Sequence, residues 1–215
     1  MWTENQTSGR GQRNKKWISE PFTSLTFSIY KQFNHLLINP FKLNAVVCLA
    51  IINALEKLSI PELLIKWPND ILSENKKIGG ILIENYFNKS KINASVIGVG
   101  INLNQEKFEN LPKATSLKII TGEKWVSKII LDALVPLLEE YLFMFDFQDS
   151  SILDQYQKKL WRRNKTVMFK MDGKLHKGKL KGVDESGMII LQEQGKMISK
   201  FNNSQISIQY DDLLN

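Results

Sequence analysis

Between residues 65 and 104, three polar blocks alternate with apolar runs. The blocks are KWPND at Lys66–Asp70, KKIGGILIE at Lys76–Glu84 and GVGINLN at Gly98–Asn104. Each block joins a strand-like run to a turn rich in Gly, Asn, Asp or Pro, which are residues that favour tight turns or fix the backbone. We therefore expect this part of the chain to form a sheet whose strands meet at polar turns.

Two of these runs predict a β-hairpin. Gly80–Phe87 and Ala94–Leu103 are rich in strand-forming residues, and the polar residues 88–91 join them. Pairing of the strands would bring the lysines of the first two blocks, the glycines and Asn102 together. Glycines within strands suggest that a ligand or another backbone approaches closely. Each block taken alone is equally compatible with an ordinary hairpin that carries exposed lysines.

A second glycine-bearing segment lies upstream, in Thr7–Trp17. It places Gly9 and Gly11 among four cationic residues, Arg10, Arg13, Lys15 and Lys16. Such a loop can surround a phosphate with backbone N–H groups and cationic side chains. It is also compatible with a flexible basic loop or an RNA-contacting tail.

In this order, the blocks resemble the catalytic domain of biotin protein ligases. The family pattern is Gln-x-x-Gly-Arg-Gly, Lys-Trp-Pro-Asn-Asp, Lys-Ile/Leu-x-Gly-Ile-Leu-x-Glu and Gly-x-Gly-x-Asn. It stands here as Gln6 with Gly9-Arg10-Gly11, then Lys66–Asp70, Lys77–Glu84 and Gly98–Asn102. The resemblance covers nearly the whole chain. It implies an α+β fold, with a mixed β-sheet and packed helices followed by a small SH3-like β-barrel.

The resemblance also implies a division into a catalytic domain at residues 1–163 and a C-terminal domain at 164–215. From Lys165 onward, short β-like runs separated by turns independently indicate a barrel of about five strands. In the family, a strand, a helix and a Ser-Thr-Asn motif precede the residues that match Met1. We therefore expect an N-terminally shortened domain. Its unpaired strand edge favours self-association, such as a homodimer.

Further elements follow from hydrophobic periodicity. Ser24–Tyr30 alternates as a strand does, and helical spacing begins after Pro40 and continues to Leu58. A long amphipathic helix is predicted from Trp125 to Phe147, with Pro136 expected to bend or split it. A shorter helix is predicted over residues 151–161.

Composition narrows the class of protein. The 43% hydrophobic content supports a packed core, and the apolar runs are too short to span a membrane. Cys48 is the single cysteine, which excludes an intrachain disulfide and is compatible with a reducing cytoplasm. It falls inside the first predicted helix, where we expect a buried thiol. The net charge of +7 is compatible with a nucleic-acid-binding protein. It is also compatible with an enzyme that binds anionic nucleotides and an acidic carrier domain. We favour the enzyme, because no nucleic-acid-binding or zinc motif accompanies the charge.

The resemblance implies two half-reactions. The biotin carboxylate attacks the α-phosphorus of ATP, supplied with Mg²⁺, to give biotinyl-5′-AMP. A lysine of the biotin carboxyl carrier protein of acetyl-CoA carboxylase then takes the biotinyl group. Because two anions must meet, fixed cations and N–H donors are the main catalytic groups. A DNA-binding domain and a protein nucleophile are not expected.

The site residues come from the family motifs. Lys66 and Arg10 are the expected catalytic cations. The expected biotin-binding residues are Gln6, Arg10, Gly11, Gln12, Lys66, Gly79 and Gly80, and the expected nucleotide-binding residues are Arg10, Trp17, Asn69, Lys77 and Asn102. No protein ligand to a metal is expected, because His35 and His176 lie far apart without Cys or His neighbours.

Four alternatives remain open. A lipoate ligase shares the fold and adenylation chemistry but differs in its motifs, and an octanoyltransferase needs a catalytic cysteine that Cys48 is badly placed to supply. The other two are a basic nucleic-acid-binding module and a non-catalytic remnant of the fold. Gln12 and Asn14 stand where relatives often have Arg and Gly, which makes the loop less basic and changes its turn.

Overall fold

The computed structural model describes residues 1–215 apart from 38, 90, 110, 145–150 and 211–215, and it omits the side chains of residues 14, 34–37 and 144. A six-stranded sheet has the strand order β1-β4-β8-β7-β6-β5. Its strands are β1 (Trp2–Thr3), β4 (Ser24–Leu37), β5 (Leu64–Lys66), β6 (Asp70–Ser73), β7 (Lys76–Asn88) and β8 (Lys91–Asn102). All ladders between these strands are antiparallel, and parallel pairing among the described residues is confined to isolated bridges.

The predicted hairpin is confirmed as β7 and β8, which form the centre of the sheet together with β4. Glu84 lies opposite Val96, and Gly80 lies opposite Gly100. The strand predicted at Ser24–Tyr30 is also present, but it continues to Leu37 because its second half pairs with the start of β8. The short β1 pairs with β4 at the edge of the sheet, and self-association through this edge stays a prediction.

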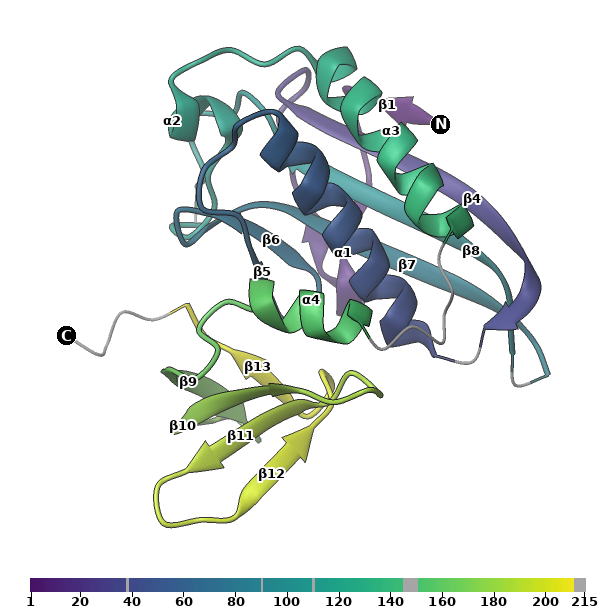
Figure 1. Ribbon diagram of the computed structural model, residues 1–215. Helices are drawn as coiled ribbons and strands as arrows, with labels where there is room; N and C mark the ends of the chain where they lie inside the picture. The colour runs from purple at the N-terminus through teal and green to yellow at the C-terminus, as the bar shows by residue number, and fades with distance from the viewer. Residues whose placement is uncertain (38, 90, 110, 145–150, 211–215) are drawn as a thin grey trace.

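Helices cover one face of the sheet. The helix α1 (Pro40–Lys57) is capped by the side chain of Asn39 and buries eleven of its residues. It packs beside α3 (Ser127–Met144) on the same face, as Figure 1 shows. Two shorter helices are α2 (Leu117–Thr121) and α4 (Ser151–Lys159). The predicted end of α3 at residues 145–147 lies outside the described residues.

Pro136 does not split α3, and a bend of the helix at this proline stays a prediction. The helix is one continuous element across the proline. Leu134, Leu137 and Leu138 on either side of it are buried in the core. Their packing offsets the loss of one backbone hydrogen bond, because burial of three leucine side chains is worth several kcal/mol, roughly 1.5–3 each.

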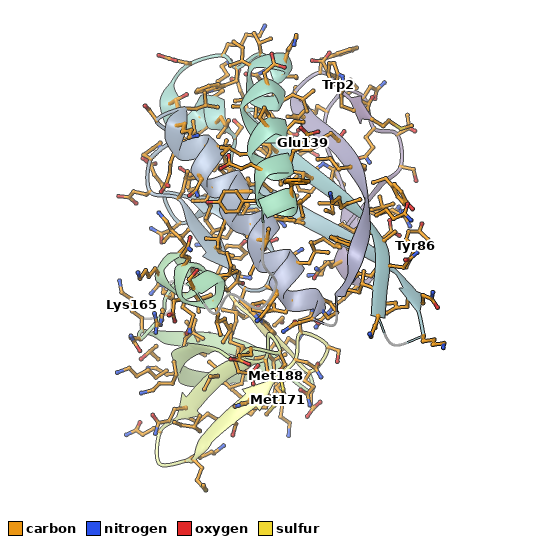
Figure 2. All side chains as sticks on the ribbon, turned by 45° about the vertical axis from the view of Figure 1, so that its right-hand side comes forward. Trp2, Tyr86, Glu139, Lys165, Met171 and Met188 are labelled. Carbon is orange, nitrogen blue, oxygen red and sulfur yellow. The ribbon has the colours of Figure 1, made fainter. Side chains whose placement is uncertain are left out.

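The C-terminal sheet has five antiparallel strands in the order β12-β11-β10-β9-β13. Its strands are β9 (Thr166–Met171), β10 (Lys174–Val183), β11 (Ile189–Glu193), β12 (Ile198–Phe201) and β13 (Ile206–Ile208). All five predicted runs therefore form strands. In Figure 2, Lys165 marks the passage from α4 into this sheet. The inner residues Phe169, Leu180 and Leu191 are almost fully buried and form its core.

The C-terminal sheet contacts the first sheet at the turn between β5 and β6. The indole Nε1 of Trp67 donates a hydrogen bond to the carbonyl of Gly187 at 2.9 Å. The amide of Asn39 donates to the carbonyl of Glu185 at 2.5 Å. The turn between β10 and β11 therefore holds both the start of α1 and the KWPND block. None of the described helices is long and apolar enough to cross a membrane.

Candidate active site

A cavity of about 810 Å³ lies on the face of the sheet opposite α1 and α3. Its floor comes from the central strands β4, β7 and β8, including Ser28, Leu82 and Gly98. Ile97 and Ile101 of β8 are fully buried in the core and do not line the cavity. Its walls come from the N-terminal basic loop, the KWPND block, residues 108 and 111–114, and residues 203 and 206–210 at the end of the C-terminal sheet.

The basic loop forms a small hairpin over this floor. Its strands β2 (Gly9–Arg10) and β3 (Lys16–Trp17) flank the short helix η1 (Gln12–Asn14). Gly9 pairs with Trp17, and a Cβ at Gly9 would lie 2.4 Å from the carbonyl oxygen of Trp17. Glycine at position 9 is therefore required by the close approach of the two strands.

The hairpin touches the floor through Trp17. A Cβ at Gly100 would lie 2.7 Å from the indole ring, so the ring rests directly on the backbone of β8. The Nε1 atom of Trp17 is buried and has no hydrogen-bond acceptor among the described residues.

Lys66 is a nearly buried cation at the cavity wall, with 8% of its surface exposed. Burial lowers the pKa of its ammonium from 10.5 to about 8, and the positive charges of Lys77 and Lys15 act in the same direction. The charge of Asp70 opposes this shift. Within the described part of the chain, the Nζ atom has no hydrogen-bond acceptor and no ion-pair partner, so it is free to bind an anionic ligand.

Asp70 and Lys77 form an ion pair beside Lys66, with 2.5 Å between Nζ and Oδ1. The two asparagines of the motifs hold neighbouring backbone segments. The amide of Asn69 donates to the carbonyl of Ile81 at 2.5 Å, and that of Asn102 donates to the carbonyl of Thr115 at 3.0 Å. Both asparagines also line the cavity.

Arg10 is bound to the sheet. Its guanidinium lies 2.9 Å from the carboxylate of Glu84, and its side chain is 70% exposed. Gln12 accepts a hydrogen bond from Asn203 of the C-terminal sheet at 3.3 Å. The hairpin is therefore tied at one point to β7 and at another to the loop before β13.

The structure brings ten of the predicted site residues to the cavity: Gln6, Arg10, Gly11, Gln12, Trp17, Lys66, Asn69, Lys77, Gly80 and Asn102. Their individual roles stay predictions. Gly79 does not line this cavity. A Cβ at Gly79 would lie 2.7 Å from the carbonyl oxygen of Gly100, so close strand packing explains this glycine without a ligand.

Asp70, Glu84 and Tyr210 line the cavity and make polar contacts there, although no role was predicted for them from the sequence. Asp70 and Glu84 belong to the motifs, and their partners Lys77 and Arg10 are the signal that could have identified them. Tyr210, whose hydroxyl donates to Asp70 Oδ2 at 3.1 Å, lies beyond every motif. No pattern in the sequence indicates that this tyrosine reaches the cavity.

The described residues contain no group of three or more His, Cys, Asp or Glu side chains that could hold a metal ion. His176 stacks on Phe169 and lies 3.4 Å from Glu193 in the C-terminal sheet, whereas the side chain of His35 is outside the described residues. Cys48 is fully buried in α1, and this burial raises the pKa of its thiol. The thiol is therefore not a candidate nucleophile.

Comparison with known proteins agrees with this architecture. The sequence model of the biotin/lipoate A/B protein ligase family matches residues 2–102. The bifunctional ligase/repressor BirA of Bacillus subtilis is 34% identical over 125 residues, which is 56% of this chain and 38% of that protein. The biotin–[acetyl-CoA-carboxylase] ligase of Paracoccus denitrificans is 27% identical over 87% of this chain and 81% of its own length. This chain thus matches less than two-fifths of the length of the Bacillus relatives.

A solved structure shares nearly the complete fold. The biotin protein ligase from Aquifex aeolicus, determined in complex with biotin and ATP, has a TM-score of 0.79 and 29% sequence identity. The match covers 97% of this chain and 87% of that chain. It includes the C-terminal sheet as well as the sheet that carries the cavity. Sequence relatives, family motifs and shared fold therefore agree that this chain is similar to the biotin/lipoate A/B protein ligase family.

Proposed function

We propose that this protein is an ATP-dependent biotin–protein ligase. The names of the Paracoccus denitrificans and Aquifex aeolicus relatives support this activity. The single observation that carries the proposal is Lys66, a nearly buried cation that faces the cavity and has no anionic partner among the described residues. A buried cation without a partner is costly in a folded protein and marks a site for an anionic ligand.

In the first step, an oxygen of the biotin carboxylate bonds to the α-phosphorus of ATP. The bond from that phosphorus to the bridging oxygen of the β-phosphate breaks, and pyrophosphate leaves. Lys66 stabilises the negative charge where the carboxylate and the α-phosphate meet, because the charge of a nearly buried ammonium is weakly screened by water. Lys77 and the cationic hairpin hold the remaining phosphate charge.

In the second step, a lysine amine of the acceptor bonds to the carbonyl carbon of the adenylate. The bond from that carbon to the phosphate oxygen breaks, AMP leaves, and the amine releases a proton to solvent. The acceptor is the biotin carboxyl carrier protein of acetyl-CoA carboxylase, as the name of the Paracoccus relative suggests. No protein nucleophile takes part, which agrees with the buried thiol of Cys48.

Mg²⁺ enters this scheme as part of the substrate MgATP. The cavity supplies Asp70 and Glu84 as carboxylates, and both already bind cationic side chains, Lys77 and Arg10. Mg²⁺ is commonly held by substrate phosphates with one or two carboxylates and water. The residues present fit an ion that arrives with the nucleotide better than a resident metal.

The test is biotin-dependent exchange of pyrophosphate into ATP. Lys66→Ala is expected to slow the exchange by about 10²–10³-fold, by analogy with the loss of an oxyanion donor. Lys76→Ala is the matched control, because Lys76 is exposed at the start of β7 and does not line the cavity. Exchange at the wild-type rate in Lys66→Ala removes Lys66 from the mechanism. Pyrophosphate exchange that depends on lipoate and not on biotin overturns the choice of biotin as the substrate acid.

A further inference from the structure

Lys66 and Asp70 are directly opposite each other on the antiparallel strands β5 and β6. Opposite charges in this position normally attract each other and form a cross-strand pair. Here they do not form an ion pair within the described residues. Asp70 uses Oδ1 to bind Lys77 at 2.5 Å and Oδ2 to accept the hydroxyl of Tyr210 at 3.1 Å.

Tyr210 contacts both charged groups. The Nζ atom of Lys66 lies 4.2 Å from the centroid of its ring, while its hydroxyl points to Asp70. A cation over an aromatic face is attracted by the ring without being neutralised. One side chain therefore covers the cation with an apolar surface and at the same time occupies the carboxylate that would pair with it.

Tyr210 is held in this place by the C-terminal sheet. It follows β13, whose pairing with β9 continues as a hydrogen bond from the Gln209 N–H to the carbonyl of Met168 at 2.9 Å. Its ring also packs on Trp161, with 5.8 Å between the ring centroids. The position of the tyrosine thus depends on the docking of the C-terminal sheet against β5 and β6.

We propose that Tyr210 is a positioning residue for the reaction, which keeps Asp70 away from Lys66 so that the lysine remains free to bind the reacting anions. The effect of Tyr210 on catalysis rests on the proposed function. The electrostatic coupling of Tyr210 to Lys66 is a property of the empty protein and is tested without substrate. The C-terminal sheet thereby takes part in adenylation through one side chain.

The direction of the effect on Lys66 follows from its neighbours. The charged groups that act on it are Asp70, which raises its pKa, and Lys77 and Lys15, which lower it. In Tyr210→Phe the ring still covers Lys66, but Asp70 Oδ2 loses its donor and turns to Lys66. In Tyr210→Ala, water also reaches the ammonium. Both changes favour the charged form, so both variants raise the pKa of Lys66.

The first experiment measures this pKa directly. Wild-type protein and both variants are treated with trace acetic anhydride across a pH series, and acetylation of Lys66 is quantified by mass spectrometry. The midpoint in the wild type is expected near pH 8. In Tyr210→Phe it is expected to rise by about one unit, the lower end of the shift caused by a close opposite charge. Tyr141→Phe is the control, because it removes a partly buried tyrosine hydroxyl that binds Asn53, away from the cavity.

The second experiment follows the pH profile of pyrophosphate exchange. Because the charged form of Lys66 is the active one, wild-type activity falls as the pH rises through its pKa. Tyr210→Phe is expected to move this alkaline limb to higher pH and to lower the plateau by about tenfold, as Asp70 competes with the substrate anions. Tyr141→Phe keeps the wild-type profile. If Tyr210 has only a structural role, Tyr210→Phe lowers the maximal activity but leaves the pH of the alkaline decrease unchanged.

A midpoint of Lys66 acetylation that is the same in wild type, Tyr210→Phe and Tyr210→Ala overturns the inference. A shifted midpoint supports it even when the wild type shows no exchange, because labelling needs no reaction. Absence of wild-type exchange with biotin counts against the proposed function alone. The two conclusions can therefore fail separately.

Discussion

The indole ring of Trp17 rests on Gly100 so closely that a Cβ there would lie 2.7 Å from the ring atoms. This contact joins the N-terminal hairpin to the centre of the sheet and accounts for the second glycine of the Gly-x-Gly block. Gly98, two residues earlier, has more room, since its nearest contact for a Cβ is the carbonyl oxygen of Leu82 at 3.4 Å.

Gly100→Ala is therefore expected to displace the hairpin while the sheet remains folded. Overpacking of this kind costs about 1–3 kcal/mol, and we expect the affinity for biotin and ATP to fall about tenfold, which is 1.4 kcal/mol. Isothermal titration measures the affinity, and hydrogen exchange of residues 9–17 reports the hairpin. Gly98→Ala adds a methyl to the same strand without touching Trp17, so it should leave hydrogen exchange of residues 9–17 at the wild-type rate. Equal exchange of residues 9–17 in the two variants would show that Trp17 need not stay on Gly100.

The ion pair between Arg10 and Glu84 is expected to restrain the hairpin without stabilising the fold. The two side chains are 70% and 43% exposed, and such pairs contribute about 0.2–1 kcal/mol. Glu84→Gln should leave the midpoint of thermal unfolding nearly unchanged and speed hydrogen exchange in residues 9–17 by up to about fivefold, the equivalent of 1 kcal/mol.

Glu106→Gln is the matched control, because Glu106 is an exposed carboxylate paired with Lys118 outside the cavity. It should leave exchange in the hairpin unchanged. Adding biotin and MgATP should slow exchange of the hairpin in the wild type, since an anion offsets the repulsion among its cationic side chains. Unchanged exchange at saturating ligand would contradict ordering of the hairpin over the adenylate.

Lys66 is expected to lower the stability of the fold in a pH-dependent manner. Its pKa is about 8 in the folded protein against 10.5 in the unfolded chain, so the folded state binds fewer protons between these values. The free energy of unfolding therefore rises with pH from about 8 to 10.5, and the cost of the buried charge is fully present below pH 8.

Lys66→Met should consequently be more stable than the wild type at neutral pH, by up to about 3 kcal/mol at roughly 1.4 kcal/mol for each pKa unit. The difference should shrink as the pH approaches 10.5. Urea unfolding at several pH values measures it, and Lys76→Met, which changes an exposed lysine, should show no such trend. A stability difference between Lys66→Met and the wild type that does not vary with pH would refute the role of the buried charge.

The central hairpin, α1 and all five strands of the C-terminal sheet follow from local pattern. Period-2 alternation and apolar runs bounded by Gly, Asn and Pro determine strands through contacts between residues near in sequence. At Pro136 the helix is not split, and α3 packs against α1. The strand predicted to end at Tyr30 continues to Leu37, because this continuation depends on pairing with β8.

The sequence by itself determined which motifs stand in the chain. Through them it determined the resemblance to a family and the choice of Lys66, Lys77 and Asn102 as candidate ligand-binding residues. Only the tertiary structure decided that Gly79 is required for close packing of the strands. It also decided that Lys66 forms no ion pair with Asp70, the residue opposite it on the neighbouring strand. It also decided that Tyr210 reaches Asp70. The reason is physical: pairing, burial and pKa depend on groups brought together across the fold, and 140 positions separate Tyr210 from Asp70 in the chain.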